Sequence, residues 1–162
     1  RPTFVLYIET FSISSKFLPT ITGALYSIVG IFSIFSAAWW GKRVEKTGVF
    51  QNVIYASLLT GVMYIAHSFM YNVYLLIPIR ILLGFGYGAL SPLLFTAISN
   101  DVSSDRKGGV LGVGSSFQIL GNMIGPVLGG FSAGFLGLSS AFLITGLFFL
   151  MITAISYFRL KK

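Results

Sequence analysis

Five long, almost uninterrupted apolar stretches decide what this chain can fold into. They cover residues 21–40, 49–70, 73–98, 110–136 and 139–158. About 20 consecutive apolar residues form a helix that is long enough to cross a bilayer. In lipid, every backbone N–H and C=O group must be bonded internally, so stretches of this length cross as helices. The sequence therefore predicts an all-α integral membrane protein with five complete spans.

The composition excludes an ordinary soluble domain. Hydrophobic residues make up 55% of the 162 residues and charged residues only 9%, against about 25% charged residues in a typical soluble domain. The chain contains no cysteine, which excludes a disulfide framework and a thiolate metal site. No span carries a nucleophile beside a base, or a set of metal-binding side chains. We therefore expect neither an enzyme nor a metal or cofactor site.

The net charge of +7 comes largely from short basic clusters outside the spans. These clusters lie within residues 42–46, 101–107 and 159–162. If the spans alternate in direction, all three clusters fall on one side of the membrane, and the connections on the other side carry only Lys16 as a basic residue. Loops rich in lysine and arginine stay in the cytoplasm, so the basic loops and the C-terminus are predicted to be cytoplasmic, in a multi-pass protein of the plasma or inner membrane. This distribution leaves no basic face for a nucleic acid.

The first residues have the composition of a span but not its length. Residues 1–8 are mostly apolar, and the polar, serine-containing segment 9–16 follows them. Because eight residues cannot cross a bilayer, we interpret residues 2–8 as the end of a sixth span. The chain begins with Arg1 rather than methionine, so we expect it to be part of a longer natural protein.

Three glycine-containing motifs accompany the spans. Residues 41–48 read Gly-Lys-Arg-Val-Glu-Lys-Thr-Gly and predict a tight, charged loop. In the second motif, Arg80 lies inside a span and is followed by Gly84 and Gly88; in the third, Gly121, Gly125 and Gly129 share the same spacing and enclose Pro126. Small residues four apart lie on one helix face and allow helices to approach closely in lipid. The proline removes a backbone donor and predicts a kink.

Together, these three motifs resemble those of the major facilitator superfamily, most closely the twelve-span drug:proton antiporters. Because Val49 and Phe50 follow Gly48, where the family's loop usually continues with two basic residues, the chain is most similar to the C-terminal half. The resemblance implies a six-helix bundle of five complete spans and the end of a sixth over residues 1–162. Residues 1–8 would then end helix 7, and residues 21–40, 49–70, 73–98, 110–136 and 139–158 would form helices 8 to 12.

The resemblance also implies a function. A transporter of this kind exports amphipathic or cationic drug-like compounds by alternating access, coupled to protons, and the glycine motifs allow its halves to rock. The implied partners are the lipid bilayer, a small-molecule substrate and a missing N-terminal six-helix half. A sugar, amino-acid or organic-acid carrier of the same superfamily is an alternative. A non-transporting membrane scaffold is an alternative of another class.

Two polar stripes and one charge are candidates for a substrate cavity. Placing the charge of Arg80 in the hydrocarbon region of the membrane costs free energy. Its side chain is therefore expected either to face the bundle interior or to extend along the helix to the membrane interface. The stripes are Tyr87, Ser91 and Phe95, and Ser115, Gln118 and Asn122, each set on one helix face. Packing between helices, without contact to substrate, is the alternative for both stripes. His67, near the end of its span, is predicted to lie at the membrane interface, as are Trp39 and Trp40.

The acidic residues all lie at span ends or in loops. They are Glu9, Glu45, Asp101 and Asp105. No carboxylate lies within a span, so an acid that binds the coupling proton is expected in the missing half. We expect a cytoplasmic latch instead, in which Gly41, Glu45, Lys46 and Gly48 of one loop meet Asp101, Asp105 and Arg106 of the other.

Overall fold

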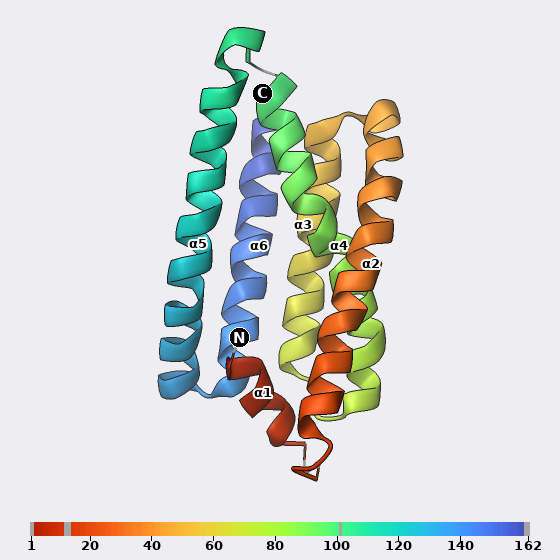
Figure 1. The fold of residues 1–162 in the computed structure, drawn as a ribbon, viewed down its shortest axis with the longest axis vertical. Coiled ribbons are helices and arrows are strands. Elements are labelled where there is room, and N and C mark those ends of the chain that lie inside the picture. Colours follow the sequence, from red (N-terminus) through yellow and green to blue (C-terminus); the bar gives the residue numbers. More distant parts are fainter. Residues whose placement is uncertain (1, 12–13, 101, 161–162) are drawn as a thin grey trace.

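A computed structural model describes residues 2–11, 14–100 and 102–160 of the chain (Figure 1). The described residues form helices α1 (Pro2–Glu9), α2 (Leu18–Thr47), α3 (Val49–Ser68), α4 (Val73–Asn100), α5 (Lys107–Leu136) and α6 (Leu138–Leu160), with a short 3-10 turn η1 (Ser104–Arg106). Five of them are long and apolar enough to cross a membrane. The predicted all-α membrane fold is therefore confirmed.

The long helices run up and down the bundle in alternation (Figure 1). The end of α2, the turn η1 and the end of α6 lie at one end of the bundle, which we call the basic end because it carries residues 42–46 and 104–107 (Figure 1). α1 occupies only the lower part of the bundle and descends toward the opposite end (Figure 1).

Two pairs of helices are joined by a single glycine each. Gly48, with φ 80° and ψ 159°, separates α2 from α3, and Gly137, with φ 91° and ψ 159°, separates α5 from α6. Non-glycine residues avoid this region of backbone conformation. The two corners lie at opposite ends of the bundle (Figure 1).

The first of these corners corrects the predicted charged loop. Residues 41–47 are helical and extend α2 by two turns beyond the apolar stretch, so only Gly48 departs from the helix. Lysine, arginine and glutamate are good helix formers, and Lys46 in the last turn lies where the helix dipole favours a cation. Glu45 consequently lies near the C-terminus of α2, and not in the first turn of α3.

Close helix packing occurs at glycines, but not at all those predicted. α4 packs against α2, where a Cβ atom at Gly84 would lie 2.7 Å from the carbonyl oxygen of Val29 and one at Gly88 would overlap Ser33. α3 packs against α6 at Gly61 and Gly146, which the sequence motifs did not include; a Cβ atom at Gly146 would lie 2.8 Å from the carbonyl oxygen of Gly61. These contacts hold α2, α3, α4 and α6 together.

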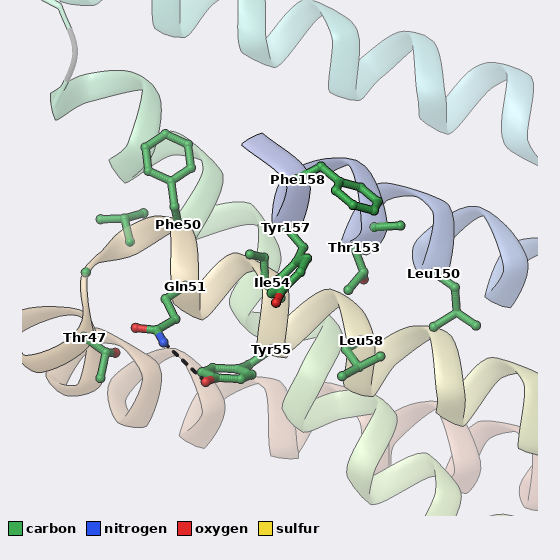
Figure 2. Close-up of a pocket in the computed structure, with 13 residues that line it drawn as sticks. Thr47, Phe50, Gln51, Ile54, Tyr55, Leu58, Leu150, Thr153, Tyr157 and Phe158 are labelled. Atoms are coloured by element: carbon green, nitrogen blue, oxygen red, sulfur yellow. Dashed lines mark hydrogen bonds between the residues drawn. The ribbon is translucent and has the colours of Figure 1, made fainter. Parts of the chain in front are cut away.

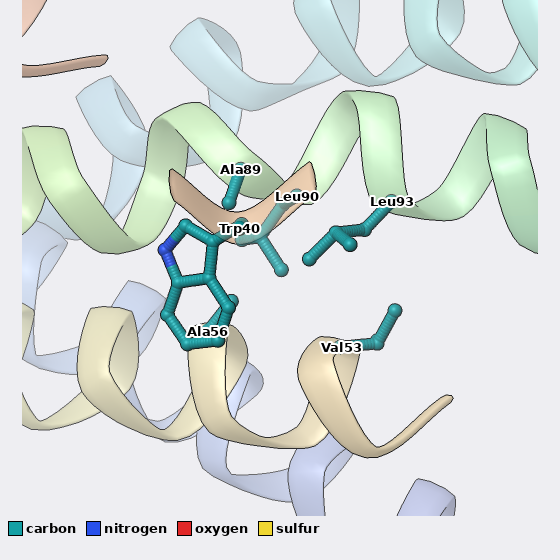
Figure 3. Packing of buried hydrophobic residues seen from close by; sticks show 6 residues of the cluster. All are labelled: Trp40, Val53, Ala56, Ala89, Leu90 and Leu93. Carbon is teal, nitrogen blue, oxygen red and sulfur yellow. The ribbon is translucent and has the colours of Figure 1, made fainter. Parts of the chain in front are cut away.

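An apolar core lies between α2, α3 and α4 near the basic end. Trp40 packs there among Val53, Ala56, Ala89, Leu90 and Leu93 (Figure 3). Its indole Nε1 donates a hydrogen bond of 3.1 Å to the carbonyl oxygen of Phe85, and only 5% of the residue is exposed. Trp40 therefore faces the core of the bundle, whereas Trp39 is 46% exposed; their level at the membrane interface stays a prediction. Because the two residues are adjacent on a helix, they point in different directions, and only one can reach the core.

α5 is the least embedded of the long helices. None of its residues is buried, and its phenylalanine, leucine and isoleucine side chains are exposed along its length. α2 also buries few residues on its own chain. Both helices therefore offer long faces for contacts outside this chain.

Candidate functional site

Arg80 is a buried charged residue that contacts side chains of several helices in the interior of the bundle. It lies in α4, two turns from the start of the helix at Val73, and is only 7% exposed. Its guanidinium carbon lies 3.7 Å from the ring centroid of Phe4 and 5.6 Å from that of Tyr26. Stacking on aromatic rings favours a planar cation when water is excluded. Arg80 therefore faces the bundle interior and does not extend to the interface.

His67 of α3 is the polar partner of this arginine. Its Nε2 atom lies 3.1 Å from Nη2 of Arg80, and the residue is fully buried. An arginine can only donate hydrogen bonds, so His67 accepts through Nε2 and carries its proton on Nδ1. The prediction that His67 lies at the membrane interface is therefore wrong, because it is drawn into the bundle by Arg80.

The surrounding helices enclose this pair with aromatic side chains. The ring of Phe142 from α6 lies 4.3 Å from that of His67. The hydroxyl of Tyr7 from α1 reaches the carbonyl oxygens of His67, at 2.8 Å, and of Met70. These carbonyls belong to the C-terminal turn of α3 and to the residues after it, where backbone acceptors have no helical donor. Tyr7 thus fixes α1 to the end of α3.

A cavity of about 560 Å³ lies beside Arg80. It is lined by Thr3 and Phe4 of α1, Tyr26 and Val29 of α2, Tyr64 of α3, Arg80, Leu83 and Tyr87 of α4, Asn122, Gly125, Pro126 and Gly129 of α5, and Ala141, Phe142 and Thr145 of α6. In the part of the chain that the structure describes, the lining contains five aromatic rings, the charge of Arg80 and no acidic side chain. Pro126 has no N–H group, so it cannot donate the helical hydrogen bond to the carbonyl oxygen of Asn122.

The structure brings some of the predicted site residues together and separates others. Arg80, Tyr87 and Asn122 line the cavity. Ser91 instead accepts a hydrogen bond of 3.3 Å from Gln118, which joins α4 to α5. Phe95 lies against Gly114, because a Cβ atom there would be 3.3 Å from its ring. Ser115 is exposed on α5. The stripe from Tyr87 to Phe95 thus follows the contact with α5 and is only partly a cavity wall.

The glycine motif of α5 does not pack against the described part of this chain. A Cβ atom built at Gly121, Gly125 or Gly129 meets no described side chain or neighbouring backbone within 4 Å. Gly125 and Gly129 border the cavity, whereas Gly121 faces open space. Pro126 lies within a helix that continues from Lys107 to Leu136. The close contact predicted for these glycines is therefore not seen within the described part of the chain.

The predicted latch residues lie at the basic end. Glu45, Lys46, Asp105 and Arg106 are exposed, and the hydroxyl of Ser104 donates a local hydrogen bond of 3.3 Å to Asp105. Asp101 lies outside the described residues. The latch remains a prediction.

A second hollow, of about 940 Å³, opens between α3 and α6 near the basic end (Figure 2). Its walls are almost entirely apolar, formed by side chains such as Ile54, Leu58, Leu150 and Phe158. It is larger than the cavity at Arg80, but its described lining includes no charged side chain and no residue of α4 or α5. We call it the α3/α6 groove, and we place the candidate site at Arg80, where polar groups from several helices converge.

Comparison with known proteins assigns the family. Residues 2–162 match the Major Facilitator Superfamily. The chain belongs to this superfamily of membrane transporters. Within the superfamily, it is 27% identical over its full length to the multi-drug resistance efflux pump PmrA homolog of Lactococcus lactis, of which the match covers 40%. It is 31% identical, over 89% of its length, to the multidrug resistance protein MdtG of Proteus mirabilis, of which the match covers 36%.

A third relative agrees with these two. The multi-drug resistance efflux pump PmrA of Streptococcus pneumoniae is 26% identical over 99% of the chain. The chain spans about two fifths of the length of these major facilitator relatives, 36% to 40%. As a member of this superfamily, it is a multi-pass membrane protein of a transporter family rather than of an enzyme family.

Proposed function

We propose that the chain is the C-terminal half of a twelve-span transporter that exports amphipathic or cationic drug-like compounds by alternating access. The helices α1 to α6 then correspond to the end of helix 7 and to helices 8 to 12. The names of the matched relatives, which are multidrug efflux pumps, support the substrate class. The unpacked glycines of α5 support a second half that packs against this face.

The observation that carries the proposal is the aromatic cavity around Arg80. Rings of Phe4, Tyr26, Tyr64, Tyr87 and Phe142 line it, and such rings can stack on flat, amphipathic compounds of varied structure. The cavity is bounded by α5, whose exposed face would meet the other half. Rocking of the halves about this contact would open the cavity to one side of the membrane and then to the other.

Proton coupling and orientation complete the proposal. Among the described residues, the acidic side chains of Glu9, Glu45 and Asp105 lie at helix ends or between helices, so the acid that exchanges the coupling proton would be supplied by the other half. The concentration of lysine and arginine at the basic end supports a cytoplasmic position for this end and for the C-terminus. The protein would then reside in the cell membrane.

One observation favours a second candidate, an organic-acid carrier of the same superfamily. Among the described residues that line the cavity, Arg80 alone is charged, and it attracts a carboxylate rather than a cation. A cationic drug would require a carboxylate from outside this half to balance Arg80. The charge of the transported compound therefore separates the two candidates.

The test is efflux by the full-length transporter that contains this chain. Cells that express it are loaded with either ethidium, a cation, or carboxyfluorescein, an anion, and are then energised. Drug export predicts that ethidium leaves the cells, that a protonophore stops it, and that Tyr87→Ala, which removes an aromatic ring from the cavity, reduces it while the exposed control Ser115→Ala does not. Export of carboxyfluorescein alone favours the organic-acid carrier. No energised efflux of either dye would contradict both candidates.

A further inference from the structure

The α3/α6 groove has the composition of a site for hydrocarbon chains. Its lining combines Ile54 and Leu58 of α3 with Leu150, Ala154 and Phe158 of α6. Phe50, Leu58 and Phe158 are 51%, 43% and 69% exposed, so the groove is open along its side. It shares no lining residue with the cavity at Arg80. The substrate pathway proposed above therefore does not account for it.

Polar groups gather at one end of the groove, next to the Gly48 corner. Thr47 and Gln51 line this end, and Nε2 of Gln51 donates a hydrogen bond of 3.3 Å to the hydroxyl of Tyr55 (Figure 2). Tyr157 of α6 lies beside them in the lining. Tyrosine side chains of this kind are enriched at the level of lipid headgroups. The groove thus has an apolar body and a polar mouth.

A cationic group adjoins this mouth. The guanidinium carbon of Arg43 lies 5.7 Å from the ring centroid of Tyr55 and 5.2 Å from that of Trp39. Its Nε atom is buried and has no hydrogen-bond partner among the described residues. Thr47, one turn later, donates a hydrogen bond of 3.1 Å to the backbone carbonyl of Arg43, so Arg43 lies on the face of α2 that leads into the groove.

The other charges near the mouth are also mainly positive. Lys42 and Lys46 are exposed in the same two turns of α2. The one acid there, Glu45, is two residues from Arg43 and therefore lies about 200° around the helix from it. The mouth is therefore complementary to an anion.

We propose that the α3/α6 groove binds an anionic phospholipid, with an acyl chain along the apolar walls and the phosphate at Arg43 and Lys46. Apolar grooves with basic residues at the level of the headgroups are the sites that bind such lipids between transmembrane helices. A cationic drug is disfavoured by the basic mouth, and a free anion would leave the apolar body of the groove unused. The bound lipid would cover the joint between α3 and α6 and stabilise their contact.

Lipid retention by the purified full-length transporter tests this proposal without any transported substrate, so the result is independent of drug export. The detergent-solubilised protein is mixed with equal amounts of phosphatidylglycerol and phosphatidylcholine, and bound lipid is counted by native mass spectrometry. We expect preferential retention of phosphatidylglycerol. The double variant Arg43→Gln/Lys46→Gln should weaken it roughly tenfold or more. Its matched control, Arg106→Gln/Lys107→Gln, removes two cations from the same end but from no part of the groove.

A second variant tests the apolar part of the site. Ala154→Trp fills the groove and should abolish retention, whereas Ile155→Trp, at an exposed neighbouring position outside the groove, should not. The proposal is overturned if phosphatidylcholine is retained equally, or if the two control variants reduce retention as much as the groove variants. It is also overturned if glycerol phosphate, which has the headgroup charge but no acyl chain, displaces the lipid at equal concentration.

Discussion

Arg80 of α4 and His67 of α3 are held together by a hydrogen bond of 3.1 Å inside the bundle. Both side chains are buried, and the rings of Phe4 and Phe142 close over them. A cation in a span normally has a partner, and the interaction with this partner offsets part of the hydration free energy that the cation loses in the membrane. Here the partners of Arg80 are the neutral imidazole of His67 and the ring of Phe4. They hold the guanidinium in place, but neither carries a negative charge that would neutralise it.

Replacing His67 tests the role of this hydrogen bond. His67→Leu leaves Arg80 without its acceptor and should destabilise the protein by about 2 kcal/mol. His67→Gln, whose amide oxygen can accept the same hydrogen bond, should recover most of this loss. The measurement is the thermal unfolding of the purified full-length transporter, followed by size-exclusion chromatography after heating. Equal stability of the Leu and Gln variants would show that the hydrogen bond is not important for folding.

The two glycines of the 41–48 motif should respond differently to substitution. Gly48→Ala forces an alanine into a backbone conformation with φ 80° and ψ 159°, at a cost of about 1–3 kcal/mol. Gly41→Ala, within α2 and with open space around its Cβ position, should be neutral or stabilising by up to about 1 kcal/mol. The same thermal assay separates them. A larger loss at Gly41 than at Gly48 would contradict the one-residue corner.

A third pair compares a packed glycine with an unpacked one. A methyl group at Gly84 would press on the backbone of Val29 in α2, so Gly84→Ala should lower stability by about 1–3 kcal/mol. Gly130→Ala in α5 meets nothing within 4 Å and serves as the control. If Gly130→Ala in the full-length transporter is as costly as Gly84→Ala, then a surface outside this chain packs on α5 at this position.

The predicted latch can be tested by exchanging charges. Glu45→Arg and Arg106→Glu should each reduce transport by the full-length protein, because each leaves like charges opposed across the basic end. The double variant should restore transport if the two side chains meet during the cycle. Efflux rates of the single and double variants form a double-mutant cycle. Failure of the double variant to restore transport would exclude this pair from the latch.

The apolar stretches located all five long helices, because a helix in lipid must be apolar over the thickness of the bilayer. They could not locate the helix ends. Residues 41–47 are charged but helical, since charge marks where a helix leaves the lipid and not where its hydrogen bonds stop. Glycine in a special conformation ends α2, and the sequence does not distinguish Gly48 from Gly41 in this respect.

The candidate site was only partly predictable. Arg80 could be selected because a charge within a span is costly. His67, Phe4 and Phe142 could not, because their importance depends on which helix faces touch. One signal was present for His67: a connection of only four residues, 69–72, separates α3 from α4, and so short a connection predicts antiparallel neighbours. A polar residue near the end of one such helix is within reach of a long side chain on the next.

The one-glycine corners also have a consequence for how the protein is made. Since only Gly48 separates α2 from α3, and only Gly137 separates α5 from α6, the second helix of each pair leaves the ribosome directly behind the first. Neither pair has a hydrophilic linker that could rest on one side of the membrane while the next helix is synthesised. Each pair should therefore enter the bilayer as a preformed hairpin. Substitutions at these glycines should reduce the amount of protein inserted into the membrane more than they reduce the transport rate of the molecules that have assembled.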